Sequence, residues 1–304
     1  MSRPVHTIDV HLAATAPFAF APAVAFVSRF GPLADSMRAP DDATVAEALS
    51  VDGQPILAEL RASEGGLAVT FTSAEPLEPQ VVEHSSRLIT DQFGLAEDLD
   101  PFYRIARTDD AFARVLDALH GYRQVRFPSA FEAAVWAILS SRSFRTQSIK
   151  RRRDLLETFS GPIPGTDLRA FPEAAQLAPV PWEVLDEAMH QRKRAQYVVA
   201  IAEAFAGVDP DFLASAPDEA VEEWLMRIPG VGPWTAEFVM IRGLGRMDRL
   251  PHDKALLRAA GRIYGPEGMA LTEERLEQIA ADYGTQCGYW AHYLRVFAAT
   301  PTQG

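Results

Sequence analysis

The chain has 304 residues, 48% of them hydrophobic, and a formal net charge of −12 at pH 7. It contains no run of about 18 apolar residues, which excludes a membrane-spanning helix, and its first residues lack the pattern of a secretory signal. The single cysteine, Cys287, excludes an internal disulfide. We therefore expect a globular, monomeric protein of the reducing cytoplasm that does not associate with membranes.

The first third of the sequence is expected to form a small lobe that mixes strands and helices. Apolar and polar residues alternate over three segments, the last two joined by a turn around Gly65-Gly66. Apolar residues at helical spacing predict helices between these strands and after them. The predicted strands are 5–12, 55–62 and 67–73, and the predicted helices are around 22–30 and 78–93.

From about residue 101 the pattern is helical throughout. Residues 131–139 form a strongly apolar helix opened by Pro128-Ser129, ended by Ser140-Ser141-Arg142 and followed by a basic helix to about 159. Further helices are predicted at 182–190, 194–206, 218–228, 233–243, 253–264, 272–282 and 288–299. The fold class is therefore α+β, with a lobe at 1–105 and a mostly α-helical, two-lobed core at 106–304.

A helix–turn–helix pattern stands at residues 218–243. Its central stretch, 225–236, reads Leu-Met-Arg-Ile-Pro-Gly-Val-Gly-Pro-Trp-Thr-Ala. Ser215 is the candidate N-cap of the first helix, Pro229-Gly230 ends that helix, and a second helix begins near Pro233. A turn that is bare of side chains can present backbone N–H groups to a phosphate. An ordinary corner between two helices, closed by a glycine cap, is the alternative.

A carboxylate follows this pattern by about twenty residues. Leu250-Pro251-His252 precede Asp253, and the helical run 254–258 comes after it, so Asp253 is expected at the N-cap. A plain cap is one interpretation of this carboxylate, and a catalytic group is the other. The pair His252-Asp253 is also found in metal phosphohydrolases, but the seven histidines show no metal-ligand spacing.

The turn, the carboxylate and the stretch Phe131-Glu-Ala-Ala-Val-Trp-Ala-Ile-Leu139 together resemble the helix-hairpin-helix DNA glycosylases. Within that superfamily the chain most resembles the 3-methyladenine DNA glycosylase II group, over nearly its whole length. The resemblance implies a DNA N-glycosylase that flips the damaged base out of the duplex, with Asp253 as the catalytic residue. A fixed carboxylate suits this chemistry, because breaking the N-glycosidic bond builds positive charge on the sugar. An alkylated purine already carries positive charge and leaves without a strong general acid.

Bifunctional members of this superfamily carry a lysine two residues after the second glycine of the hairpin, where it forms a Schiff base with the sugar. Trp234 occupies that position here. The resemblance therefore implies a monofunctional enzyme that leaves an abasic site without cutting the strand. Lys254 lies beside Asp253, but it is not at the family's lysine position.

The resemblance also assigns residues that bind DNA. Arg142 matches the residue that fills the gap left by the flipped base, where the family has an aliphatic side chain. An exposed loop arginine is the alternative for Arg142, and Arg145 is expected to contact DNA. The hairpin positions carried over are Pro229, Gly230, Val231, Gly232 and Thr235.

In the resembling family the main-chain carbonyls of the hairpin hold a monovalent cation. The matching positions are Met226, Ile228 and Val231, so a structural Na⁺ or K⁺ is the implied ion, and no other cofactor is expected. One cysteine also excludes the four-cysteine iron–sulfur cluster of some relatives.

The pocket for the base is the part of the site that departs most from the family. Phe26, Trp234 and Phe238 match family pocket positions, although Trp234 is also expected to have a structural role. A further stacking aromatic is expected before the final helix, but Gln286 or Cys287 stands there. Lys254 replaces another expected aromatic, so a more open or more polar pocket is predicted.

The negative charge is concentrated away from the proposed site. Residues 1–100 carry a net charge of −10 and residues 101–304 only −2. Basic clusters at 142–153, 192–194 and 242–249 either contact phosphate or form solvated faces. The overall acidity predicts modest non-specific affinity for DNA with a shallow salt dependence.

The leading interpretation is a monofunctional glycosylase of base excision repair that removes 3-methyladenine and related alkylated purines from damaged duplex DNA. A non-catalytic hairpin protein that binds DNA or senses lesions is the first alternative. A glycosylase for oxidised or deaminated bases is the second.

Overall fold

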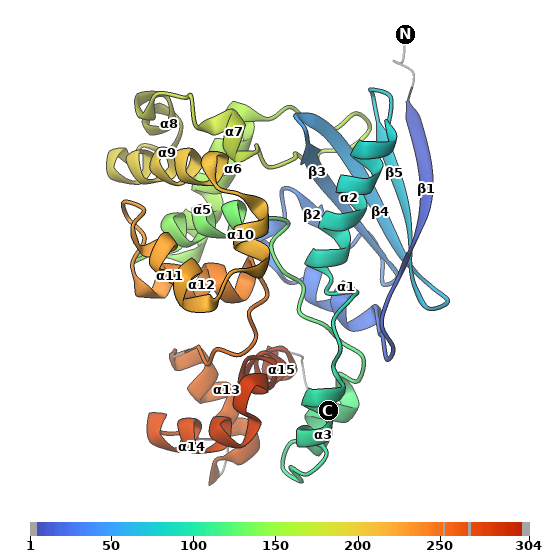
Figure 1. Ribbon diagram of the computed structural model, residues 1–304, viewed down its shortest axis with the longest axis vertical. Coiled ribbons are helices and arrows are strands. Elements are labelled where there is room, and N and C mark those ends of the chain that lie inside the picture. Colours follow the sequence, from blue (N-terminus) through green and yellow to red (C-terminus); the bar gives the residue numbers. More distant parts are fainter. Residues whose placement is uncertain (1–4, 252, 267–268, 300–304) are drawn as a thin grey trace.

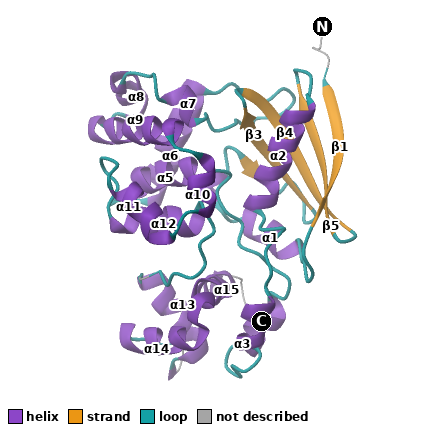
Figure 2. Cartoon of the chain, in the orientation of Figure 1, coloured by secondary structure: helices purple, strands orange, loops and turns teal. Residues whose placement is uncertain are grey.

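The computed structural model describes residues 5–251, 253–266 and 269–299. A single antiparallel sheet lies on one side of the molecule, and helices make up the rest (Figures 1 and 2). The α+β class expected from the sequence is confirmed. His252 lies outside the described residues, so the structure does not address its pairing with Asp253. No described helix is long and apolar enough to cross a membrane.

The sheet has five strands in the order β1-β5-β4-β3-β2. The three predicted strands are confirmed, and the tight turn at 64–65 joins two of them. The strands are β1 (His6–Ala13), β2 (Met37–Arg38), β3 (Thr44–Val51), β4 (Gln54–Ser63) and β5 (Gly66–Ser73).

β3 was not predicted, because its sequence Thr-Val-Ala-Glu-Ala-Leu-Ser-Val has the composition of a helix. In the fold it pairs with β2 on one side and β4 on the other, and seven of its eight residues are buried. Tertiary pairing therefore overrides local propensity here.

Two helices pack against the sheet lobe: α1 (Ala21–Val27) and α2 (Pro79–Gln92), both near the predicted positions. α2 lies across one face of the sheet (Figure 1). Ile89 of α2 is fully buried in the same hydrophobic core as Ile56, Leu60 and Phe71 of the strands. The 3₁₀ turn η1 (Gly31–Leu33) follows α1.

One helical lobe is built from segments that lie far apart in the sequence. Asp109, between the helices α3 and α4, accepts hydrogen bonds from the hydroxyls of Tyr264 (2.5 Å) and Tyr283 (2.9 Å). The predicted domain boundary at 105/106 falls at the end of α3, which packs with this lobe; the division into domains stays a prediction. The helices are α3 (Asp100–Ala106), α4 (Ala113–Ala118), α13 (Lys254–Tyr264), α14 (Glu273–Tyr283) and α15 (Cys287–Ala299).

The other helical lobe has its own core, which includes Leu139, Leu156, Ile201 and Val239. It contains α5 (Ala130–Ser140), α6 (Arg145–Phe159), α7 (Ala174–Leu177), α8 (Trp182–Met189), α9 (Arg192–Gly207), α10 (Pro210–Ser215), α11 (Asp218–Met226) and α12 (Pro233–Arg242). The short α7 and α10 were not predicted.

The structure corrects the N-cap predicted for the first hairpin helix. Ser215 is the last residue of α10, and its hydroxyl donates to the Asp211 carbonyl at 2.6 Å. Pro217 is the N-cap of α11. Pro210 starts the short helix that takes up Ser215, at a position where proline is well tolerated.

A buried polar network joins the sheet lobe to the second helical lobe. Arg152 of α6 forms an ion pair with Glu132 of α5 and donates to the Ser36 hydroxyl at 2.7 Å. Glu47 of β3 is also buried, and one of its oxygens accepts from the Gln92 amide at 2.9 Å. Because unpaired buried charges are costly, this network fixes how the two lobes meet.

Candidate active site

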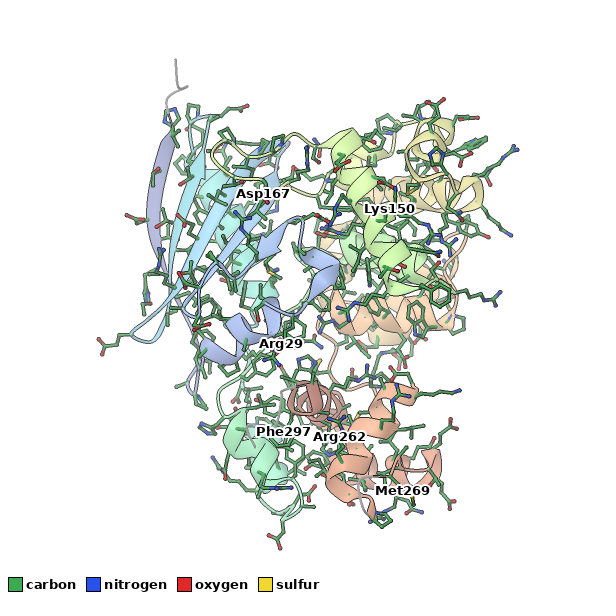
Figure 3. The ribbon with its side chains drawn as sticks, turned by 180° about the vertical axis from the view of Figure 1, so that it is seen from behind. Arg29, Lys150, Asp167, Arg262, Met269 and Phe297 are labelled. Atoms are coloured by element: carbon green, nitrogen blue, oxygen red, sulfur yellow. The ribbon has the colours of Figure 1, made fainter. Side chains whose placement is uncertain are left out.

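A cavity of about 720 Å³ opens where α1, α12 and α15 approach one another. Figure 3 shows Arg29, which follows α1, beside the helix α15 that carries Phe297; both residues line the cavity. Arg29 also donates to the carbonyl of Ala299 at 3.0 Å, which closes this side. The wall is mostly apolar, and its polar groups come from several elements.

Asp253 lines this cavity, and three donors fix its carboxylate. Oδ1 accepts hydrogen bonds from the backbone N–H groups of Ala255 and Leu256, each at 2.9 Å, as expected for the N-cap of α13. Oδ2 accepts from the Arg295 guanidinium at 2.7 Å. The side chain is 38% exposed, so the carboxylate is oriented by the protein and remains open to solvent.

The structure shows contacts at Asp253 beyond those of a plain cap, and the catalytic role of this carboxylate stays a prediction. A plain cap uses only the helix N–H groups, whereas here the second oxygen is held by an arginine from α15, a different element. Arg295 was missed in the sequence, because only the fold brings α15 to the start of α13.

Aromatic rings form two connected groups in the cavity wall. Trp234 and Phe238, one turn apart on α12, have ring centroids 5.6 Å apart. Phe26 and Phe30 stack at 4.8 Å, and Phe127 contacts both groups edge-on, with centroids 5.9 Å from Phe30 and 5.8 Å from Phe238. The three predicted pocket aromatics, Phe26, Trp234 and Phe238, thus all line one cavity. Trp234 is 47% exposed, so much of its ring faces out of the core.

Arg242 and His292 also line the cavity, and neither was predicted as a pocket residue. The Arg242 guanidinium lies 5.5 Å from the ring of Phe26 and 5.2 Å from that of Phe30. Burial lowers the pKa of Arg242 to about 10, so it remains cationic at neutral pH. Burial, together with Arg242 and Arg295, holds the pKa of His292 well below its usual value, so the imidazole is neutral. Gln124 also lines the cavity, and its Oε1 has no hydrogen-bond partner among the described residues.

The structure corrects the expectation for Gln286 and Cys287. Neither residue lines the cavity; Gln286 ends the turn η3 (Gly284–Gln286), and Cys287 is buried in the core as the first residue of α15. Burial raises the pKa of the Cys287 thiol. α15 instead presents Gly288, His292 and Arg295 to the cavity.

The predicted hairpin lies between α11 and α12. Gly230 has φ +90°, and a Cβ there would lie 2.4 Å from Cγ of Tyr197, so this position requires glycine. Gly232 is the N-cap of α12 with φ −110°, and a Cβ there would meet nothing within 4 Å. The glycines therefore have different functions: Gly230 forms the turn, and Gly232 keeps the space in front of α12 open.

The side chains of the turn divide between solvent and core. Pro229 is exposed, whereas Val231 and Thr235 are buried. Thr235 can therefore reach a ligand only through its backbone N–H, which lies in the first turn of α12 and lacks a partner within the helix. The Nζ of Lys193 lies 5.8 Å from the ring of Tyr197, which places a positive charge beside the turn.

The monovalent cation stays a prediction, and the carbonyls assigned to it are uncharged oxygen donors at the end of α11 and in the turn. Met226 is the last residue of α11, where carbonyls lack donors within the helix and carry the negative end of the dipole. The Ile228 carbonyl accepts from the Val231 N–H at 3.0 Å and keeps a second lone pair. Uncharged oxygen donors of this kind fit Na⁺ or K⁺.

Several of the predicted basic residues are engaged within the protein. Arg249 donates to Asp218 at 3.2 Å and to Glu222 at 2.7 Å, and Arg246 donates to Asp218 at 2.5 Å. These contacts fix the segment before Asp253 against α11. Arg145 lines the cavity and is exposed, and Arg142 is exposed in the loop before α6 with φ +49°.

The chain is similar to known DNA glycosylases in sequence and in fold. The chain is 25% identical, over 228 residues, to the DNA-3-methyladenine glycosylase of Bacillus subtilis (strain 168), covering 74% of this chain and 75% of that protein. Its fold matches the 3-methyladenine DNA-glycosylase of Archaeoglobus fulgidus with a TM-score of 0.77 and 20% identity, over 98% of this chain and 100% of that one. These similarities in sequence and in fold support the helix-hairpin-helix DNA glycosylase superfamily for this chain. No protein-family model matches the sequence.

The helix-hairpin-helix glycosylase fold also occurs in enzymes for other lesions. An 8-oxoguanine glycosylase/lyase of Clostridium acetobutylicum matches with a TM-score of 0.64 and 17% identity, over 87% of both chains. Among the described residues that line the cavity of the present glycosylase there is no lysine. Trp234 occupies the position at which the hairpin of bifunctional members carries one.

Proposed function

We propose that this glycosylase flips alkylated purines, 3-methyladenine among them, out of duplex DNA and hydrolyses their N-glycosidic bond in base excision repair. The observation that carries the proposal is Asp253: an N-cap carboxylate held by two N–H groups and Arg295 at the wall of an aromatic cavity. The relative in Bacillus subtilis supports the choice of substrate.

The hairpin supplies the DNA contact in this proposal. The backbone N–H groups at the start of α12 face the open space beside Gly232, where a phosphate can approach closely. Pro229 and Gly230 shape the exposed turn, while Val231 anchors it in the core. The carbonyls of Met226, Ile228 and Val231 would hold a monovalent cation, which would stiffen the turn.

The flipped base would stack against Trp234 and Phe238. The other aromatic group is less available, because Arg242 already covers Phe26 and Phe30. An electron-poor alkylated ring is attracted to the faces of the two α12 aromatics. Gln124 is an uncharged polar group of the wall that suits the base edge.

Asp253 would act on the sugar. As the bond to the base lengthens, positive charge grows on the sugar, and a fixed carboxylate stabilises it without reorganisation. The same carboxylate orients the attacking water and accepts its proton. Because the described lining of the cavity includes no lysine that could replace water as the nucleophile, the proposed product is an abasic site in an intact strand.

The test is to incubate the protein with methylated duplex DNA, separate the released bases by chromatography, and examine the strands before and after alkali. Release of methylpurines, with strand breaks only after alkali, is expected. Oligonucleotides with 8-oxoguanine or hypoxanthine form the control panel. Release confined to these, or strand cutting without alkali, would contradict the proposal.

A further inference from the structure

The loop between α5 and α6 exposes an aromatic ring. Phe144 is 77% exposed, which is the largest value for a large apolar side chain among the described residues. A phenylalanine normally contributes to folding by leaving water. The exposed ring therefore contributes little packing energy to the free protein, which points to a use in a complex.

Hydrogen bonds from two arginines hold the loop backbone that carries this ring. Arg194 of α9 donates to the Ser141 carbonyl at 2.6 Å and to the Ser143 hydroxyl at 2.8 Å. Arg151 of α6 donates to the same hydroxyl at 2.9 Å. The Phe144 carbonyl in turn accepts from the Ser148 hydroxyl at 3.2 Å.

Two guanidinium groups thus meet at one short loop. Burial and the charge of Arg151 lower the pKa of Arg194, which shows that the arrangement works against solvation and like-charge repulsion. These hydrogen bonds fix the backbone at Ser141 and Ser143 and leave the Phe144 ring free. A side chain that inserts into a binding partner needs a rigid backbone of this kind.

The loop also stands at the edge of the proposed site. Arg145, the residue after Phe144, lines the cavity that holds Asp253. Arg142 is exposed too, but it sits at a φ of +49°, on the other side of the clamped Ser143. Phe144 is therefore an exposed apolar side chain directly adjacent in sequence to a residue of the cavity wall.

We propose, on the basis of the proposed function, that Phe144 rather than Arg142 enters the DNA base stack where the damaged nucleotide has left it. Arg151 and Arg194 are positioning residues that hold the loop for this step. Stacking of an aromatic ring on neighbouring bases offsets part of the unstacking free energy. Arg142 is left to contact the phosphate backbone.

The test compares two duplexes that carry one 7-methylguanine, placed opposite cytosine or opposite a one-nucleotide gap. Phe144→Ala is expected to lower kcat/KM about 10- to 100-fold on the paired duplex and much less on the gapped one, where extrusion is easy. Phe144→Trp should restore the rate. Arg194→Met should show the same selective loss, and Arg142→Ala a uniform one.

A second readout does not depend on base release. In a duplex with a tetrahydrofuran abasic analogue beside 2-aminopurine, wild type should change the fluorescence and Phe144→Ala should not. That signal without any base release would retain the inference and contradict the proposed function. Equal effects of Phe144→Ala on the paired and gapped duplexes, or an unchanged fluorescence response in Phe144→Ala, would overturn the inference.

Discussion

The two glycines of the hairpin allow one matched experiment on fold and function. Gly230→Ala places a methyl group 2.4 Å from Cγ of Tyr197 at a backbone φ of +90°. The left-handed conformation costs a non-glycine residue about 1–2 kcal/mol, and overpacking against the ring adds about 1–3 kcal/mol. Gly230→Ala is therefore expected to lower the free energy of unfolding by about 2–5 kcal/mol.

Gly232→Ala is the control for stability. Its φ of −110° is open to alanine, and the added methyl group meets nothing within 4 Å. The small loss of a glycine N-cap and the small gain in chain entropy offset each other to within about 0.5 kcal/mol. The methyl group occupies the space through which the phosphate would approach, so DNA affinity should fall although the fold is unchanged.

Urea unfolding and fluorescence anisotropy with a labelled duplex measure the two quantities. The reasoning predicts a stability defect in Gly230→Ala and a pure binding defect in Gly232→Ala. Wild-type stability of Gly230→Ala would refute the described turn. Wild-type DNA affinity of Gly232→Ala would refute the assignment of this face to DNA.

Two further predictions concern Arg295 and Glu47. Arg295→Met should reduce the rate of single-turnover base release about 10- to 100-fold, because the Asp253 carboxylate is then no longer held in one orientation. The free energy of unfolding in urea should change little, because the ion pair is partly exposed. An unchanged rate of base release would contradict the orienting role of Arg295. Burial raises the pKa of Glu47 to about 8, so the folded protein retains a proton that the unfolded chain loses above its ordinary pKa of 4.5. The stability associated with this proton is present below pH 4.5 and is lost as the pH rises toward 8, by at most about 1.4 kcal/mol per pH unit. Glu47→Gln should flatten this decline in urea unfolding at pH 5, 6.5 and 8; the same slope in both proteins would contradict it.

The sequence predicted those helices and strands whose conformation depends mainly on the local pattern of apolar residues. The apolar period of 3.6 located most of the long helices, and alternation located three strands. β3 was missed because Ala-Glu-Ala-Leu favours a helix, and only its neighbours on both sides make it a strand. α7 and α10 are too short for a periodic signal.

The residues of the candidate site were likewise predicted where they lie in a continuous motif and missed where only the fold brings them together. Asp253 and the hairpin lie in continuous motifs, and the structure places them at the cavity wall and in an exposed turn. Arg242 and Arg295 reach the cavity from α12 and α15, and no local pattern connects these helices. Gln286 and Cys287 were aligned to a wall position, but successive helix residues point about 100° apart, and Gly288 faces the cavity instead.

The measurement that tests the central claim most directly is single-turnover release of methylpurines by wild type beside Asp253→Asn. Asparagine keeps an acceptor for the N–H groups of Ala255 and Leu256, so the fold and DNA binding should persist. Loss of the negative charge is expected to slow release at least about 100-fold. Full excision activity in Asp253→Asn would contradict the account, and absence of release by wild type despite DNA binding would favour a non-catalytic lesion sensor.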